Sequence, residues 1–225
     1  MPVTHDVEQG SLAWIRLRTG LPTASSFDQI LTPGGKPSAS QDRYLKELLA
    51  EVLMGRAIQA PTIAILQRGH DLESTAVEYY EMQRDVETKK VGFVLDDSGR
   101  FGASPDREVG DDGMLEIKCP LPAAHIGYLL MEPASKDYWA QLQGQLLVTG
   151  RQWVDIVSYH PDMPMAVSPR VHRDEEYIAL LSKELHKFCD RFDAAKKLLR
   201  DRGLMPEPAQ PIVDAMEINM EDFLA

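Results

Sequence analysis

Cysteine is scarce in this sequence, and long apolar runs are missing from it. Cys119 and Cys189 are the two cysteines among 225 residues, too few for a disulfide framework or for a four-cysteine zinc or iron–sulfur site within one chain. No apolar run approaches the roughly 20 residues of a membrane-spanning helix, and the N-terminal segment lacks the basic and apolar regions of a signal peptide. These absences predict a soluble protein of a reducing compartment, the cytoplasm, with no membrane partner.

Basic residues are in the minority. The chain has 24 Lys and Arg against 35 Asp and Glu, for a formal net charge of -11. Phosphate contacts come from Lys and Arg, so this balance argues superficially against a nucleic-acid partner. However, residues 206–225 hold acids and no base, and carboxylates gathered around metal cations do not repel a ligand once the metal is bound. The net charge therefore leaves the partner open.

The length and the residue pattern predict one large domain. We assign residues 1–205 to a single folded unit and residues 206–225, which begin PEPAQP, to an acidic tail. Helical and strand-like segments follow one another in an order typical of a mixed sheet flanked by helices, an α/β or α+β fold. Helices are expected at 11–19, from about 23, and at 41–55, 67–84, 122–131, 136–149 and 174–201. Strands are expected at 88–95, 100–108 and 114–119, as an antiparallel meander, and at 152–160 and 165–173.

Two local features qualify this pattern. Ser25, with Asp28 three residues later, has the spacing of a capping box and predicts the N-cap of the second helix. The Gly, Pro and Ser content of residues 32–41 predicts a flexible loop.

A hairpin around GASPDREVGDDGMLEIKCP (102–120) concentrates charge on a strand that should be buried. Side chains alternate across a strand, so Glu116 and Lys118 share one face. The GDDG turn returns the preceding strand so that Asp106 lies opposite Glu116 or one residue away. Two carboxylates this close cannot both stay ionised without a cation between them, and Mg²⁺ suits oxygen ligands. Lys118 could orient a metal-bound water and stabilise the transition state, so the three residues predict hydrolytic chemistry.

The helix expected at 67–84 supplies a further carboxylate. Glu73 falls on its apolar stripe, where an acid is costly unless it is paired or bound to a metal. We expect it to be a second-metal or water-mediated ligand. Taken alone, Asp106 could be a turn residue, Glu116 and Lys118 a cross-strand ion pair, and Glu73 a boundary residue. Their combination is much rarer than any one of them, and it favours the hydrolytic interpretation.

These motifs resemble a known nuclease family. Pro105-Asp106 followed by Glu116-Ile117-Lys118 is similar to the signature of the PD-(D/E)XK nuclease superfamily, with its restriction-endonuclease-like core. WIRLRTGLPTAS, the GxxxE helix, ASPD…LEIKCP and DYWAQLQ…LVTG resemble, in the same order, the lambda-exonuclease-like phage recombination nucleases. Related helicase-associated nucleases often have Tyr four residues after the active-site Gln. Here Gln141 is followed by Gln145, which favours the phage branch.

The resemblance implies an activity and a set of roles. It implies a Mg²⁺-dependent exonuclease, with Mn²⁺ as an alternative metal and two ions per site. Such an enzyme degrades one strand of linear double-stranded DNA from the 5′ end to mononucleotides, in a bacterial host cell. Family members form a homotrimeric ring and work with a single-strand annealing protein. The implied roles are metal binding for Asp106, Glu116 and the Ile117 carbonyl, the second metal for Glu73, action on the water for Lys118, and an active-site glutamine at Gln141.

The sequence also suggests where DNA binds. Arg18 beside the hydroxyls of TASS could complete a pocket for a terminal 5′-phosphate with Ser25 at a helix N-terminus; alternatively Arg18 is a surface residue and Ser25 a simple cap, and the resemblance favours the pocket. Lys36 and Arg43 are candidate phosphate contacts. The alternative functions are a PD-(D/E)XK endonuclease and a non-catalytic protein that binds DNA ends in recombination.

Overall fold

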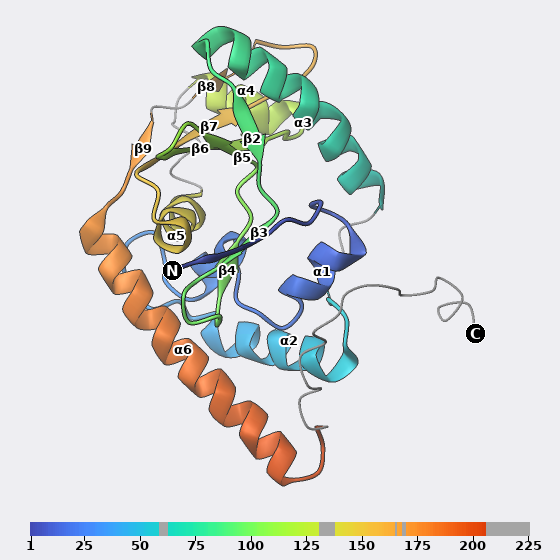
Figure 1. Ribbon diagram of the computed structural model, residues 1–225, viewed down its shortest axis with the longest axis vertical. Coiled ribbons are helices and arrows are strands. Elements are labelled where there is room, and N and C mark those ends of the chain that lie inside the picture. The colour runs from blue at the N-terminus through green and yellow to red at the C-terminus, as the bar shows by residue number, and fades with distance from the viewer. Residues whose placement is uncertain (59–62, 131–137, 165, 168–169, 206–225) are drawn as a thin grey trace.

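The protein is described here by a computed structural model that covers residues 1–58, 63–130, 138–164, 166–167 and 170–205, with 63–71 and 166–167 described as backbone only. Figure 1 shows the arrangement of the elements. The helical elements are α1 (Leu12–Arg18), the 3₁₀ helix η1 (Ala24–Gln29), α2 (Gln41–Met54), α3 (Ile63–Arg84), α4 (Pro122–Leu130), α5 (Trp139–Thr149) and α6 (Glu175–Asp201). The strands are β1 (Val3–His5), β2 (Thr88–Lys90), β3 (Phe93–Leu95), β4 (Gly102–Ala103), β5 (Arg107–Val109), β6 (Gly113–Lys118), β7 (Trp153–Ser158), β8 (Ala166–Val167) and β9 (Val171–His172).

The strands form two sheets. A six-stranded mixed sheet has the order β2-β5-β6-β7-β8, with β9 also paired to β7, and a three-stranded sheet has the order β1-β3-β4. β6 and β7 are parallel, and α4 and α5 lie between them in the chain; the other pairs of the large sheet are antiparallel. This arrangement confirms the predicted α+β class with a mixed sheet flanked by helices.

Helices cover both faces of the large sheet (Figure 1). On one face, Ala76, Val77 and Tyr80 of α3 pack against Leu115, Ile117 and Val157. On the other face, Leu142 and Leu146 of α5 pack against Met114, Val154 and Ile156. A further cluster joins α2, α5, α6 and η1 on the side of α5 away from the sheet. α5 is therefore buried on two sides, which suits a helix that must hold polar groups at fixed positions.

A glycine allows η1 to lie directly on α5. A Cβ atom built at Gly144 would lie 2.8 Å from Phe27 Cε2 and nearer still to Cδ2, closer than real side chains approach. Phe27 is fully buried and its ring packs edge-on against Phe101 at 6.1 Å between centroids, so it has little room to move. Gly144 thus sets the distance between η1 and α5.

The predicted three-strand meander is confirmed in its antiparallel pairing, but its first two strands are not continuous. The segment 88–95 is two strands, β2 in the large sheet and β3 in the small one, and 100–108 is likewise divided between β4 and β5. The chain leaves the large sheet at Gly92, where a Cβ would clash with the backbone of His5 and Val7. It returns at Pro105, which lacks the N–H that continued pairing requires. Both predicted antiparallel pairings are nevertheless present: 88–95 pairs with the 100–108 segment as β2 with β5 and β3 with β4, and β5 pairs with β6.

Smaller predictions also need correction. Ser25 is not an N-cap: Thr23 occupies that position, no side chain caps η1, and the element is a six-residue 3₁₀ helix. The loop predicted at 32–41 is present as far as residue 40, with Thr32 N donating to Lys36 O at 2.8 Å, and Gln41 already begins α2. The 165–173 strand is two short strands, β8 and β9, and the predicted start of the helix at 136 and the tail 206–225 lie outside the described residues. Among the described helices, none has the length and apolar character needed to cross a membrane.

Candidate active site

The β5–β6 hairpin carries three of the predicted catalytic residues, Asp106, Glu116 and Lys118. Arg107 pairs with Leu115, so Asp106, one residue before β5, comes opposite Glu116. The Asp106 carboxylate is fixed there because its Oδ2 accepts a hydrogen bond from Ile117 N at 2.6 Å. Leu115 and Ile117 pack on the α3 side, so strand alternation turns Glu116 and Lys118 toward α5.

Glu116 is buried, with 3% of its surface exposed, and it is surrounded by donors. Its Oε1 accepts from Lys118 Nζ and from Gln141 Nε2, each at 2.6 Å. Its Oε2 accepts from Gln145 Nε2 at 2.7 Å. Gln141 and Gln145 are four residues apart and therefore lie on one face of α5, which explains how a single helix reaches both carboxylate oxygens.

Lys118 is held from two directions besides Glu116. Gln141 Oε1 lies 3.3 Å from its Nζ, and the Tyr138 ring centroid lies 4.4 Å from the same atom, a cation–π distance. Burial lowers the pKa of Lys118, but the charges of Glu116 and Asp106 outweigh this effect and leave the pKa raised. The side chain is therefore a charged donor rather than a neutral base at physiological pH.

Asp106 and Glu116 form a pair of carboxylates that favours a bound cation. Burial, and next the charge of Glu116, raise the pKa of Asp106 well above its usual value, although Lys118 acts in the opposite direction. Such a carboxyl either takes up a proton or shares a cation with its neighbour. No group of three or more His, Cys, Asp or Glu within the described ranges is placed to hold a metal. Two carboxylates with carbonyl and water oxygens fit Mg²⁺, which commonly keeps several waters, better than a metal needing a full protein cage.

Glu73 lies on the other side of the hairpin. Its Oε1 forms an ion pair with Arg107 Nη1 at 2.8 Å, and the same nitrogen donates to Asp106 O at 2.8 Å. Arg107 thus connects α3 to the backbone of the first metal-ligand candidate. Sequence reasoning missed Arg107, although its position next to Asp106 on an alternating strand directs it to the α3 face.

Arg18 and Ser25 do come together, in a cavity of about 270 Å³ between α1, η1 and α2. Arg18 Nη2 lies 3.3 Å from Thr23 Oγ1 and 3.2 Å from Ser25 Oγ, and its guanidinium stacks on the Trp14 ring at 4.0 Å. Burial lowers the pKa of Arg18 to about 10, which still leaves it charged at neutral pH. Hydroxyls are weak partners for a guanidinium, which favours an anion beside Arg18, although Glu47 and Glu51 also line the cavity.

The cavity is connected to the hairpin. Trp14 Nε1 donates to Ser104 Oγ at 2.9 Å, two residues before Asp106. Thr23 forms a β-bridge with Gly102, and η1 rests on α5 through Gly144. The anion cavity and the carboxylate pair are therefore held by the same elements.

Lys36 and Arg43 are placed away from this centre. Both are exposed; Lys36 lies in the turn after η1, and Arg43 on α2 contacts Gln29 Oε1 at 3.3 Å and Glu47 Oε1 at 3.7 Å. The structure does not bring either residue into the carboxylate site.

Comparison with known proteins identifies the family. The model of the YqaJ-like viral recombinase domain matches residues 13–152. The chain belongs to the YqaJ-like viral recombinase family. Among curated protein sequences, none is significantly similar to it. The predicted resemblance to phage recombination nucleases is thereby confirmed, and membership in this family implies a nuclease that acts on DNA.

Solved structures agree with this family assignment. An alkaline exonuclease from Laribacter hongkongensis, LHK-Exo, is 32% identical with a TM-score of 0.76, over 86% of this chain and 98% of that one. LHK-Exo in complex with dAMP is similar at 33% identity and a TM-score of 0.75, over the same shares. A phage-related exonuclease from Haemophilus somnus 129PT, at 15% identity and a TM-score of 0.63 over 81% of this chain and 96% of that one, shows the shared fold alone.

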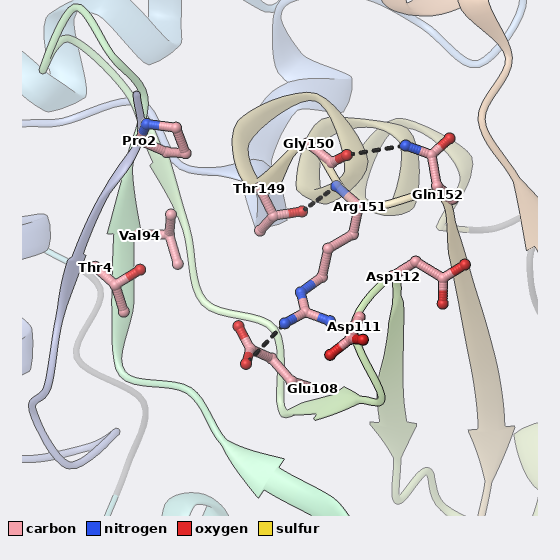
Figure 2. Close-up of a pocket in the computed structure, with 10 residues that line it drawn as sticks. All are labelled: Pro2, Thr4, Val94, Glu108, Asp111, Asp112, Thr149, Gly150, Arg151 and Gln152. Atoms are coloured by element: carbon pink, nitrogen blue, oxygen red, sulfur yellow. Dashed lines mark hydrogen bonds and ion pairs between the residues drawn. The ribbon is translucent and has the colours of Figure 1, made fainter.

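A second hollow, of about 300 Å³, lies at the turn of the same hairpin (Figure 2). Arg151 lies at its centre. Its guanidinium forms an ion pair with Glu108 Oε2 at 2.8 Å and donates to Gly110 O and Gly113 O at 3.1 and 2.9 Å. None of the predicted catalytic residues lines this hollow. Arg151 instead fastens the turn whose geometry sets the register of Asp106 against Glu116.

Proposed function

We propose that this protein is a divalent-metal-dependent exonuclease that degrades one strand of linear duplex DNA from its 5′ end. Family membership supports a nuclease. The observation that carries the finer proposal is the arrangement of Asp106, Glu116 and Lys118 on one hairpin, connected to the cavity of Arg18. Mg²⁺ is the preferred ion, with Mn²⁺ able to replace it, because both accept carboxylate and water oxygens.

The residues would divide the chemistry between them. The first ion would be held by Asp106, Glu116 and the Ile117 carbonyl. Glu73 would bind the second ion, and to do so it must give up its ion pair with Arg107. A divalent ion supplies charge stabilisation and an acidified water. Lys118, kept cationic by the two carboxylates, would donate to the attacking water and to the phosphate oxygens as negative charge develops. Gln141 holds Lys118 and Glu116 in a fixed relation.

The Arg18 cavity would select the 5′ end of a strand and so set the direction of degradation. A 5′-phosphate placed against Arg18, Thr23 and Ser25 gains charge-assisted hydrogen bonds that an internal phosphodiester would have to bend to reach. Lys36 and Arg43 are exposed and lie outside the carboxylate site; we propose that they contact the duplex backbone away from the scissile end. The resemblance to lambda-exonuclease-like nucleases further supports a homotrimeric ring, a 3′ single-stranded product and a single-strand annealing protein as partner.

The test uses linear duplex DNA labelled on the base of one 5′-terminal nucleotide, ending in a phosphate or a hydroxyl, with Mg²⁺ or with EDTA. We expect labelled mononucleotide with Mg²⁺ only, released faster from the phosphorylated end. Release at the same rate from both kinds of end would contradict a 5′-phosphate pocket at Arg18. A covalently closed circular duplex is the control substrate: its cleavage would show an endonuclease, and absence of any turnover would support a non-catalytic end-binding protein.

A further inference from the structure

Gln145 is a buried polar residue that contacts the candidate active site without taking part in the chemistry described above. It lies in the middle of α5 with 1% of its surface exposed. Its Nε2 donates to Glu116 Oε2 at 2.7 Å. This contact is made to the oxygen that neither Lys118 nor Gln141 touches.

The two carboxylate oxygens of Glu116 differ in the number of hydrogen bonds that they accept. A carboxylate oxygen accepts about two hydrogen bonds. Lys118 and Gln141 together use both positions of Glu116 Oε1, whereas Gln145 uses one position of Oε2 and leaves one open. Oε2 is thus the oxygen available to a cation, and Gln145 fixes its direction.

The other end of the Gln145 side chain has no partner. Its Oε1 is buried and, within the described part of the chain, accepts no hydrogen bond; an orphan of this kind costs about 1–3 kcal/mol. Reversing the amide would not help, because Oε1 would then face the Glu116 carboxylate. A residue chosen for packing alone would not carry this cost.

Gln143, two residues earlier on the same helix, shows what a structural glutamine looks like here. It is fully buried, donates to His172 O at 2.9 Å and accepts from Asp174 N at 2.9 Å. Both ends of its amide are satisfied, and it joins α5 to the start of α6. Gln143 therefore serves as a matched control for Gln145.

We propose that Gln145 is a positioning residue that holds Glu116 Oε2 ready for the divalent cation and thereby sets the affinity of the site for that cation. This inference rests on the proposed metal-dependent function. Partners that orient metal ligands typically change metal affinity by about 10- to 100-fold when removed. Gln145→Met keeps the volume of the side chain and removes the N–H.

The test measures Mn²⁺ binding to the full-length protein without DNA, by electron paramagnetic resonance of the free ion, for wild type, Gln145→Met and Gln143→Met. We expect Gln145→Met to weaken Mn²⁺ binding by about 10- to 100-fold and to raise the Mg²⁺ concentration that gives half-maximal cleavage, while excess Mg²⁺ restores most of the rate. Gln143→Met should lower the melting temperature and leave Mn²⁺ binding unchanged. Gln145→Leu is the second variant if Gln145→Met does not fold.

The outcomes separate the two proposals. Wild-type protein that neither binds Mn²⁺ nor cleaves DNA would overturn the proposed function itself. Wild-type protein that does both, with Gln145→Met and Gln145→Leu binding Mn²⁺ as tightly, would overturn the role of Gln145 and leave the function standing. Equal weakening by Gln143→Met would also overturn it, because the effect would then belong to α5 packing.

Discussion

Replacing Gly144 with alanine should separate the anion cavity from the carboxylate site. The added Cβ would lie 2.8 Å from Phe27 Cε2 and nearer to Cδ2, whereas carbon atoms settle at about 3.5–4.0 Å. Phe27 is fully buried, so η1 as a whole must move away from α5. Thr23 and Ser25 move with η1, whereas Asp106, Glu116 and Lys118 stay on the hairpin.

The expected loss of stability is about 2 kcal/mol. Overpacking a core costs about 1–3 kcal/mol, and the rigid ring places this substitution at the upper end. Ala regains about 1 kcal/mol over Gly in a helix, which offsets part of the loss. For a domain of this size, about 2 kcal/mol lowers the melting temperature by roughly 4–8 °C. Gly127→Ala is the control: a Cβ at Gly127 on α4 meets nothing within 4 Å, so it should be neutral or slightly stabilising.

Two assays read the effect: thermal melting, and cleavage of duplexes with a 5′-phosphate or a 5′-hydroxyl. Gly144→Ala should reduce the preference for the phosphorylated end, with a smaller change in the rate on the hydroxylated end. An unchanged melting temperature and preference would refute the account of the η1–α5 contact. An equal loss on both ends would show that the substitution damages the chemistry rather than the cavity.

Two other substitutions test the electrostatics. The raised pKa of Asp106 means that its protonated form favours the fold, so its contribution is fully present below pH about 4 and is lost as the pH rises through the raised value. Asp106→Asn should therefore be more stable than wild type in EDTA, by a margin that widens as the pH rises above about 4, and Mg²⁺ should close the gap; a margin independent of pH in thermal melts would contradict this. Arg18→Lys keeps the charge but loses the planar fork that reaches Thr23 and Ser25, so the 5′-phosphate preference should fall by about 10-fold, roughly the 1.4 kcal/mol of one charge-assisted hydrogen bond; an undiminished preference would place the phosphate elsewhere.

The hairpin was predictable because its determinants are local. Alternation along β6 and the length of the GDDG turn place Asp106 opposite Glu116 or one residue away with no knowledge of the remaining chain, and the structure shows the first of these two positions. The division of the neighbouring strands between two sheets was not predictable in this way. It depends on the close approach of Gly92 to the N-terminal segment, and that contact joins residues far apart in the sequence.

The hydrogen-bond donors around the site could not be assigned their partners from the sequence either. Gln141 and Gln145 are visible as an i, i+4 pair, but their common target Glu116 appears only when α5 is placed on the sheet. The same is true of Tyr138 above Lys118 and of Arg107 beside Glu73. Sequence patterns give the face on which a side chain lies, and tertiary packing decides which groups share that face.

The most direct test of the account is the single-turnover cleavage rate of Lys118→Ala on 5′-phosphorylated linear duplex at saturating Mg²⁺, with DNA binding measured in parallel. Lys118 Nζ donates to Glu116 Oε1 at 2.6 Å, and its pKa is raised by both carboxylates, so its removal should slow cleavage by about 100- to 1,000-fold, while DNA binding persists. Cleavage by Lys118→Ala at the wild-type rate would contradict the assignment of this hairpin as the catalytic centre.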